Sequence, residues 1–534
     1  MTNWHKIGIP VLIGSIFFIS SLLLLTHGHL SEDAYILFQY SKKLATGQGI
    51  VFDEVSGHTE GATDFLWMLI LSVMHRSGLD LGTSAAILNA IGLSLTAYVI
   101  LKLNNNLNIR ATCGLLLILF SGGFAAALGG FSTLAYGGLY SFYTFCILQR
   151  KYKWISALSI IISLFRPDGL ILALGGIMAT LFFATKYERK KFILILLPSL
   201  LIGIFYFIWR WQYFESILPL PLQVKVKTDK LFEGVYTNLA AMRWHWLLVI
   251  PFFILLKLKD FNKIIWRDYF AIGLGPLLLF IALSFAHQSQ NVGYRFQYPI
   301  ILSLIFIYII SLNKIDKPNK ILLTFPIIGV MFGATIIYHD VKNLTNGDYI
   351  NALPQLLRQS SFICKKIAIT EAGRFPFWYD TSEMIDLVGL NSRSVVSKGA
   401  EEVLNSSKPD LIFVHHADRF DINEFDSSKS FQIKNASAIK IKNQYLGRNP
   451  VLIAPESALK FAIQNNYHAI AVQYGEENSN FNHFYFISPK LNKELFIDVL
   501  IKSHQNKISY YQSLHFELTP TNLGENYENV SCYR

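Results

Sequence analysis

"HGHLSEDAYILFQYSKKLATGQGIVFDEVSGHTEGATDFLW", His27–Trp67, begins directly after an apolar segment, residues 7–26, that is long enough to cross a bilayer. Two adjacent acids, Glu32 and Asp33, lie where the chain leaves this segment, and Glu60 comes before the chain turns apolar again. The residues after the acid pair alternate between aromatic or aliphatic and polar types. This pattern predicts short amphipathic surface helices that direct the carboxylates toward a cavity at the boundary between water and lipid.

The composition predicts a polytopic α-helical membrane protein. Of the 534 residues, 52% are hydrophobic and only 16% are charged, whereas about a quarter is usual for soluble domains. The net charge of +11 does not indicate a nucleic-acid-binding protein, because most cations form short clusters between apolar runs. Such clusters are typical of cytoplasmic loops. The first apolar segment lacks a small-residue cleavage site, which favours a retained helix over a removed signal peptide.

The apolar runs predict about 11 membrane spans. They cover residues 7–26, 84–103, 111–129, 131–149, 154–166, 168–185, 191–209, 245–258, 268–287, 298–312 and 320–338. Arg166-Pro167-Asp168 breaks the fifth run from the sixth. Clusters of Lys and Arg fall on alternate connections, so the N-terminus is expected inside the cell. Residues 27–83, 210–244 and everything after about 339 are then expected outside.

The character of the chain changes near residue 340. "KKIAIT" (365–370) and "PDLIFVHH" (409–416) are typical of short buried strands that alternate with helical segments. We therefore expect two domains. Residues 1–338 form a membrane domain whose first outer loop, 27–83, carries the acids, and residues 339–534 form a C-terminal extracytoplasmic α/β domain.

Five motifs occur in the same order as in one known family. They are the opening stretch, "FRPDGL" (165–170), "WRWQYFESILPLPLQVKV" (209–226), "GYRFQYP" (293–299) and "IAITEAGRFPFWYDTSEMIDLVGLN" (367–391). Together they resemble polyprenyl-phosphate-sugar glycosyltransferases of the GT-C superfold. They are most similar to the branch that includes mycobacterial terminal arabinofuranosyltransferases. The resemblance implies a GT-C-type enzyme of the bacterial inner membrane, with its active site and C-terminal domain facing the periplasm or exterior.

The chain also departs from the pattern of that branch. Glu32 replaces an Asp, Gln39 replaces the Arg of F-R-Y, and Leu220-Pro221 replaces Asn-Thr. "GGFST" lacks the acid of a Gly-x-Glu, and "HQSQN" replaces a Gly-Gly-Asp ahead of "GYRF". These changes leave the sugar and the acceptor open. Two other functions therefore remain in view, a lipid-linked sugar flippase or transporter and a non-catalytic envelope scaffold.

The family implies inverting transfer of a sugar, a pentofuranose such as arabinofuranose, from a polyprenyl-phosphate donor to an extracytoplasmic glycan, lipid or protein. The acceptor hydroxyl must lose a proton as it attacks, and a carboxylate in reach can take it. Asp33 is the expected base and Glu32 is its nearest competitor, because sequence does not order two adjacent acids. Glu60 would orient a sugar hydroxyl or the base. Nearby carboxylates would stabilise the oxocarbenium-like transition state.

The leaving lipid phosphate needs preorganised positive charge. The candidates are Arg295, Arg210 and Lys225, and Arg suits bidentate phosphate contact. An interfacial anchor for Arg210 and a solvated charge for Lys225 are equally compatible with the sequence. Arg166 and Asp168 form either a structural ion pair or part of the site.

No metal ligand set is expected, so activity is expected to need no cofactor. His27, His29 and His58 lack an accompanying set of thiolates, and the side chains of His415 and His416 would point to opposite faces of a strand. Cys113 and Cys146 fall in predicted spans and are expected to be packing residues. Cys364 and Cys532 fall in the domain expected outside, where an oxidising compartment would let a disulfide between them persist.

Overall fold

The computed structural model describes residues 4–53, 55–104, 107–225, 231–256, 263–286, 288, 291–315, 320–345, 352–360, 364–415, 420–422, 431–441, 450–472 and 483–516. The chain divides into two compact units. The helical unit comprises Met1–Leu24, Thr63–Glu215 and Lys225–Lys342, and the sheet unit comprises Leu25–Ala62, Ser216–Val224 and Asn343–Arg534. The acid stretch from Glu32 to Glu60 therefore belongs to the same unit as the C-terminal part of the chain.

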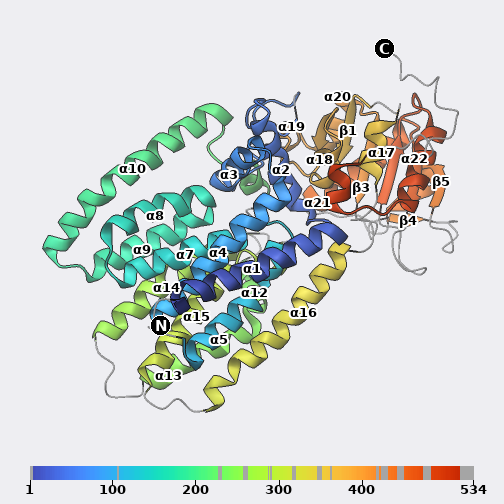
Figure 1. Cartoon of the computed structure of the whole chain (residues 1–534). Coiled ribbons are helices and arrows are strands. Elements are labelled where there is room, and N and C mark those ends of the chain that lie inside the picture. The colour runs from blue at the N-terminus through green and yellow to red at the C-terminus, as the bar shows by residue number, and fades with distance from the viewer. Residues whose placement is uncertain are drawn as a thin grey trace. The chain divides into compact units, whose positions relative to one another are not determined.

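The helical unit contains the apolar helices (Figure 1). They are α1 (Trp4–His27), α3 (Phe65–Arg76), α4 (Leu81–Leu103), α5 (Ile109–Leu119), α6 (Gly122–Leu128), α7 (Thr133–Leu148), α8 (Tyr152–Phe165), α9 (Asp168–Phe183), α10 (Lys186–Phe214), α12 (Leu231–Met242), α13 (Ile250–Leu256), α14 (Lys263–Ser284), α15 (Tyr298–Lys314) and α16 (Phe325–Thr345). Short 3₁₀ turns, η2 (Arg243–Val249), η3 (Val292–Tyr294) and η4 (Lys320–Leu323), lie between some of them.

Local sequence sets several of the helix ends. Asp80 accepts a hydrogen bond from the Thr83 N–H and so caps α4. A reciprocal capping box between Thr185 and Glu188 begins α10. The expected break at Pro167 is present, because α8 ends at Phe165 and α9 begins at Asp168.

Helix packing in this unit ranges from fully buried to fully exposed. Every residue of α15 from Tyr298 to Ser311 except Ile307 is buried, as expected for a helix that is hydrophobic all round. A close crossing joins α4 to α7, where a Cβ on Gly92 would lie 2.2 Å from the Leu134 carbonyl oxygen. By contrast, α10 lies at the margin of the unit in Figure 1 and exposes Leu194 and Phe205 to more than 60%.

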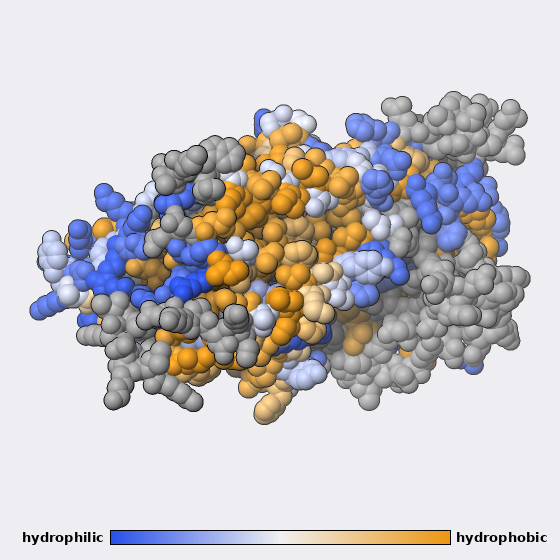
Figure 2. Space-filling view, turned by 60° about the horizontal axis from the view of Figure 1, so that its bottom comes forward, coloured by the Kyte–Doolittle hydropathy of each residue, from blue (hydrophilic) through white to orange (hydrophobic). Residues whose placement is uncertain are grey.

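Five helical runs are long and apolar enough to cross a membrane, or six if a pair bent by 43° is one span, among the residues that the structure describes. They are Lys6–His27, Leu81–Leu103, Lys186–Phe214, Leu231–Leu256 and Trp266–Ser284, with Ile109–Leu119 plus Gly122–Leu128 as the bent pair. Four shorter apolar helices are α3, α8, α9 and α15. Figure 2 shows hydrophobic side chains in a broad, continuous area of one face. The number of spans and their orientation stay predictions.

The sheet unit is built on a mixed six-stranded sheet of order β2-β1-β3-β8-β7-β5, in which β1 is parallel to β2 and β3. The strands are β1 (Lys366–Ile369), β2 (Glu383–Asp386), β3 (Leu411–His415), β5 (Phe431–Asn435), β7 (His468–Val472) and β8 (His483–Ile487), and β4 (Phe420–Ile422) pairs separately with β6 (Ile439–Ile441). Both expected strands, β1 and β3, are confirmed. Their hydrophobic side chains, such as Ala368 and Ile412, enter the core.

The helices of the sheet unit include the amphipathic helix expected after the acid pair. That helix is α2 (Glu32–Ala45). The others are α11 (Leu220–Lys225), α17 (Leu353–Gln359), α18 (Arg374–Trp378), α19 (Arg393–Lys398), α20 (Ala400–Ser407), α21 (Pro450–Gln464), α22 (Lys493–Gln505) and α23 (Tyr510–Leu514). Tyr35 of α2 is fully buried among the rings of Phe377, Trp378 and Tyr510. Aromatic packing therefore fixes α2 onto the C-terminal part of the chain.

Candidate active site

Glu32 begins α2 and is bound by the loop that follows β1. Its Oε1 accepts hydrogen bonds from the N–H groups of Gly373, at 2.7 Å, and Arg374, at 2.9 Å. Burial and the charge of Glu371 together raise the pKa of Glu32 to about 8, although the two N–H groups and the charge of Arg374 lower it. This carboxyl group is thus largely protonated near neutral pH.

Asp33 follows Glu32 in the first turn of α2 and is half-buried. Successive residues of an α-helix are turned by about 100°, so the two acids leave the helix in different directions. Both side chains are partly exposed, and the N–H groups of Gly373 and Arg374 donate to that of Glu32. The two acids of the pair therefore point in different directions.

Glu60 lies in a loop that is fastened to α2 by Tyr40. The Glu60 side chain is buried. The hydroxyl group of Tyr40 lies 3.0 Å from the Thr59 hydroxyl and accepts the Gly61 N–H at 3.1 Å. These bonds hold the residues on both sides of Glu60, so its position depends on α2.

A second group of charges lies in the helical unit and contains Arg166, Asp168 and Asp64. The Arg166 guanidinium donates to both carboxylate oxygens of Asp168, at 3.0 and 3.2 Å. It also lies 4.9 Å from the ring centre of Tyr136 and 5.7 Å from that of Phe296. The expected pairing of Arg166 with Asp168 is therefore present.

Asp64 is a member of this group that the sequence reading missed. Its Oδ2 accepts the Ser132 hydroxyl at 2.8 Å, and its charge interacts with those of Arg166, Asp168 and Arg295. A signal was available, because Asp64 directly precedes the apolar helix α3, and an acid at such a boundary is costly without partners.

Arg295 joins the same group through aromatic rings. Its guanidinium lies 3.8 Å from the ring centre of Phe131 and 5.0 Å from that of Phe296, and the residue is buried. Phe296 thus borders both arginines. Close backbone contact shapes this turn, because a Cβ on Gly293, which has φ of +57°, would lie 2.2 Å from the Gly122 carbonyl oxygen. We call Asp64, Arg166, Asp168 and Arg295 the charge cluster.

The remaining predicted site residues are less well defined. Arg210 is buried near the end of α10, 6.0 Å from the ring centre of Phe207. Lys225 ends α11, and its side chain is outside the described part of the structure. Cys364 is buried, but Cys532 lies outside the described residues, so the disulfide stays a prediction. Cys113 and Cys146 are buried in α5 and α7.

Among the described residues, no group of three or more His, Cys, Asp or Glu side chains is arranged to hold a metal ion. Both ring nitrogens of His29 are engaged, by the Tyr35 hydroxyl at 2.9 Å and the Ile508 carbonyl at 2.8 Å. Burial, together with Arg374, holds the pKa of His29 well below its ordinary value. His415 lies 2.7 Å from Glu371, and His416 is outside the described residues.

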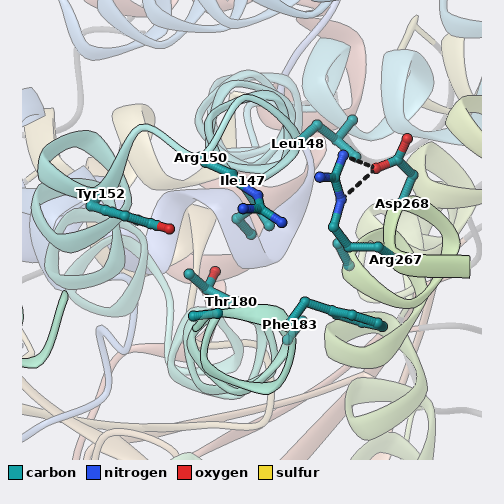
Figure 3. Close-up of a pocket in the computed structure, with 11 residues that line it drawn as sticks. Ile147, Leu148, Arg150, Tyr152, Thr180, Phe183, Arg267 and Asp268 are labelled. Carbon is teal, nitrogen blue, oxygen red and sulfur yellow. Dashed lines mark hydrogen bonds and ion pairs between the residues drawn. The ribbon is translucent and has the colours of Figure 1, made fainter. Parts of the chain in front are cut away.

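A small hollow lies between the ends of α7, α8, α9 and α14 (Figure 3). Arg150, Tyr152 and Thr180 border it, together with an ion pair between Arg267 and Asp268 at 2.6 Å. None of the predicted site residues lines it. This hollow is therefore separate from the predicted site residues.

Comparisons with known proteins give matches among solved structures. No family model matches the chain, and no curated protein matches it. Among solved structures, the chain is similar to the crystal structure of ArnT from Cupriavidus metallidurans in the apo state, with a TM-score of 0.51 and 10% sequence identity. The similarity covers 90% of this chain and 97% of that chain. At this identity the similarity shows that the two chains share a fold, while the relation to GT-C glycosyltransferases and to their arabinofuranosyltransferase branch stays a prediction.

Proposed function

We propose that this chain is an inverting membrane glycosyltransferase that uses a polyprenyl-phosphate sugar as donor. The observation that carries the proposal is a pair of acids, Glu32 and Asp33, directly after the first apolar helix of a chain that shares its fold with ArnT. The charge cluster adds support, because it supplies buried arginines for an anionic leaving group.

Asp33 is the general base in this mechanism. It takes the proton of the acceptor hydroxyl as the acceptor oxygen bonds to the anomeric carbon. The bond from that carbon to the phosphate oxygen breaks on the opposite face, so the configuration inverts. The environment of Glu32 favours this assignment, since a carboxyl group with a pKa of about 8 is largely protonated at pH 7. Glu60 orients a sugar hydroxyl or the base.

Arg295 is the principal ligand of the lipid phosphate, and Arg210 and Lys225 are the secondary candidates. Buried guanidinium groups that ring faces and carboxylates already hold need little rearrangement as negative charge develops on the leaving oxygen. The Arg166–Asp168 pair fixes the neighbouring charge. Divalent metal is not required in this scheme, because the leaving group is a monophosphate.

Arabinofuranose is the first candidate for the transferred sugar, on the motif resemblance, and the acceptor is an extracytoplasmic glycan, lipid or protein. The enzyme is proposed to lie in a bacterial inner membrane with the acids and the sheet unit on the outer side. The basic clusters between apolar helices support this orientation.

Reconstituted protein gives the decisive test. Proteoliposomes are supplied with an isolated polyprenyl-phosphate sugar and an acceptor extract, and both the donor and the glycosylated product are quantified. Transfer should consume the donor and yield a product of inverted configuration. Movement of intact donor between leaflets would instead identify a flippase, and no change in the donor would favour a scaffold.

A further inference from the structure

The acid stretch is tied to the C-terminal sequence at several points inside the sheet unit. Oε1 of Glu32 binds two N–H groups of the loop after β1. Farther along α2, the Lys42 amino group lies 2.7 Å from Asp380 and donates to the Phe377 carbonyl at 3.2 Å. Both ends of α2 are thus fastened to the segment 373–380.

The first of these ties requires a glycine. A Cβ on Gly373 would lie 1.9 Å from the backbone carbonyl oxygen of Glu32 and 2.8 Å from its Oε1. Since no side chain fits at that distance, the close approach of the two backbones depends on residue 373. The "EAGR" segment and the first turn of α2 form a single interlocked contact.

A separate chain of hydrogen bonds holds the Glu60 loop. Asp386, at the end of β2, accepts the N–H groups of Val388 and Asn391 and the side-chain amide of Asn391, each at 2.9 Å. The Asn391 Oδ1 then accepts the Tyr40 hydroxyl at 3.2 Å. Tyr40 in turn accepts the Gly61 N–H.

We propose that the loops after β1 and β2 position Asp33 and Glu60. The bonds from Gly373 and Arg374 to Glu32, which we call the latch, hold the first turn of α2 and thereby position Asp33. Asn391, through Tyr40, sets the position of Glu60. The inference rests on the proposed function for its catalytic consequence. Glu32 is then a positioning residue that takes no proton from the acceptor. The sheet unit is part of the active-site framework rather than an accessory domain.

Glu32 has a chemical property that makes the latch testable. The charged and titratable groups that interact with it are Glu371 after β1, Arg374 of α18 and Tyr35 of α2; Arg374 also interacts with His29. Because the acid is largely neutral near pH 7, Gln matches it in shape, charge and the oxygen that accepts the two N–H groups. Glu32→Gln should preserve the latch, whereas Glu32→Ala removes it.

Hydrogen–deuterium exchange of the full chain in nanodiscs, combined with donor turnover, tests the inference. Glu32→Ala and Gly373→Ala should speed exchange at least about tenfold in residues 32–36 and lower turnover by up to ~10²-fold, a loss that small misplacement can cause. Glu32→Gln should leave both near wild type. Gly273→Ala is the matched control, since its Cβ would meet nothing within 4 Å.

Tyr40→Phe tests the hydrogen bonds that hold the Glu60 loop and should speed exchange in residues 58–62. Tyr140→Phe is its control, since Tyr140 is buried and bonds Ser303 at 2.7 Å.

Unchanged exchange in Glu32→Ala, Gly373→Ala and Tyr40→Phe would overturn the inference, whatever the activity. Loss of turnover in Glu32→Gln with normal exchange would also overturn it, by making Glu32 catalytic. Faster exchange in these variants, together with a wild type that transfers no sugar, would reject the proposed function and keep the positioning contacts.

Discussion

Glu32 is a partly buried ionisable side chain and Arg166 is a fully buried one, and the chain accommodates them differently. Burial and the nearby acid Glu371 raise the pKa of Glu32 to about 8, so its carboxyl group keeps its proton near neutral pH. Arg166 is paired with Asp168 and borders aromatic rings. A buried acid can avoid charge by keeping its proton, whereas a guanidinium group stays charged and needs partners. We therefore propose different roles for the two regions: Glu32 positions the backbone, and the arginines stabilise the anionic leaving group.

The largest effect is expected at Arg295. Arg295→Ala should lower kcat/KM for the lipid donor by about 10²–10³-fold, because it removes positive charge from a buried site where charge develops. Arg295→Lys should recover only part of the loss, since an ammonium group lacks the planar fork. Steady-state kinetics in proteoliposomes measure both.

Arg150→Ala is the control for Arg295. Arg150 pairs with Glu188 at 3.2 Å with an exposed side chain, and such pairs contribute little. A loss in Arg150→Ala as large as that in Arg295→Ala would show that the charge cluster has no special role in donor binding.

A smaller effect is expected at Asp64. Asp64→Asn keeps an oxygen for the Ser132 hydroxyl but removes a negative charge that interacts with both arginines. The donor phosphate would then compete with one carboxylate fewer for the guanidinium groups. The KM for the donor should fall about three- to tenfold, which corresponds to a gain of roughly 1 kcal/mol in binding free energy. A higher KM would mean that Asp64 holds the arginines in place instead.

The pH dependence of stability should distinguish the two regions further. The pKa of Glu32 lies at about 8 in the folded chain, against an ordinary value of 4.5, so the folded state binds the extra proton between these values. The free energy of unfolding should therefore decrease as pH rises from about 4.5 to 8, because the stabilisation that comes from the proton on Glu32 in the folded state is lost. Glu32→Gln lacks this contribution, and its melting temperature should fall less over that range.

The melting temperatures of wild type and Glu32→Gln at pH 5 and pH 8 measure the difference. Titration of His29 is common to both proteins and cancels in the comparison. Equal shifts in the two proteins would indicate that Glu32 is already ionised near neutral pH.

The smallest effect is expected from chelation. EDTA should leave turnover unchanged, because the proposed mechanism neutralises the leaving phosphate with arginine. Loss of activity that a single divalent ion restores would contradict this scheme. Glu32, Asp33 and Glu60 would then be the first residues to test as ligands.

Local patterns in the sequence predicted the elements near the site but not their contacts. The alternation after Glu32 gave α2, the short apolar runs gave β1 and β3, and Arg166-Pro167 gave the helix break. The partner of Glu32 is Gly373, 341 residues away, and no local pattern indicates such a pair. The sequence therefore named Asp33 as the expected base and Glu32 as its competitor, without the bond that joins Glu32 to Gly373.

Helix lengths were predicted less well than helix positions. The apolar run expected to begin at residue 245 is part of a helical run that begins at Leu231, across α12, η2 and α13. The run expected over residues 320–338 is divided between η4 and α16, which begins at Phe325. Hydropathy indicates where the chain is apolar, whereas packing and hydrogen bonding decide where each helix starts.

The most direct test of the central claim compares Asp33→Asn with Glu32→Gln in the same proteoliposome assay of donor consumption. Each variant replaces a carboxyl group with an amide, so size and shape stay matched. We predict that Asp33→Asn loses at least about 10²-fold in turnover, with donor binding kept, as for the loss of a general base. Glu32→Gln should stay within about twofold of wild type. Normal turnover in Asp33→Asn together with loss in Glu32→Gln would contradict the account and assign the base to Glu32.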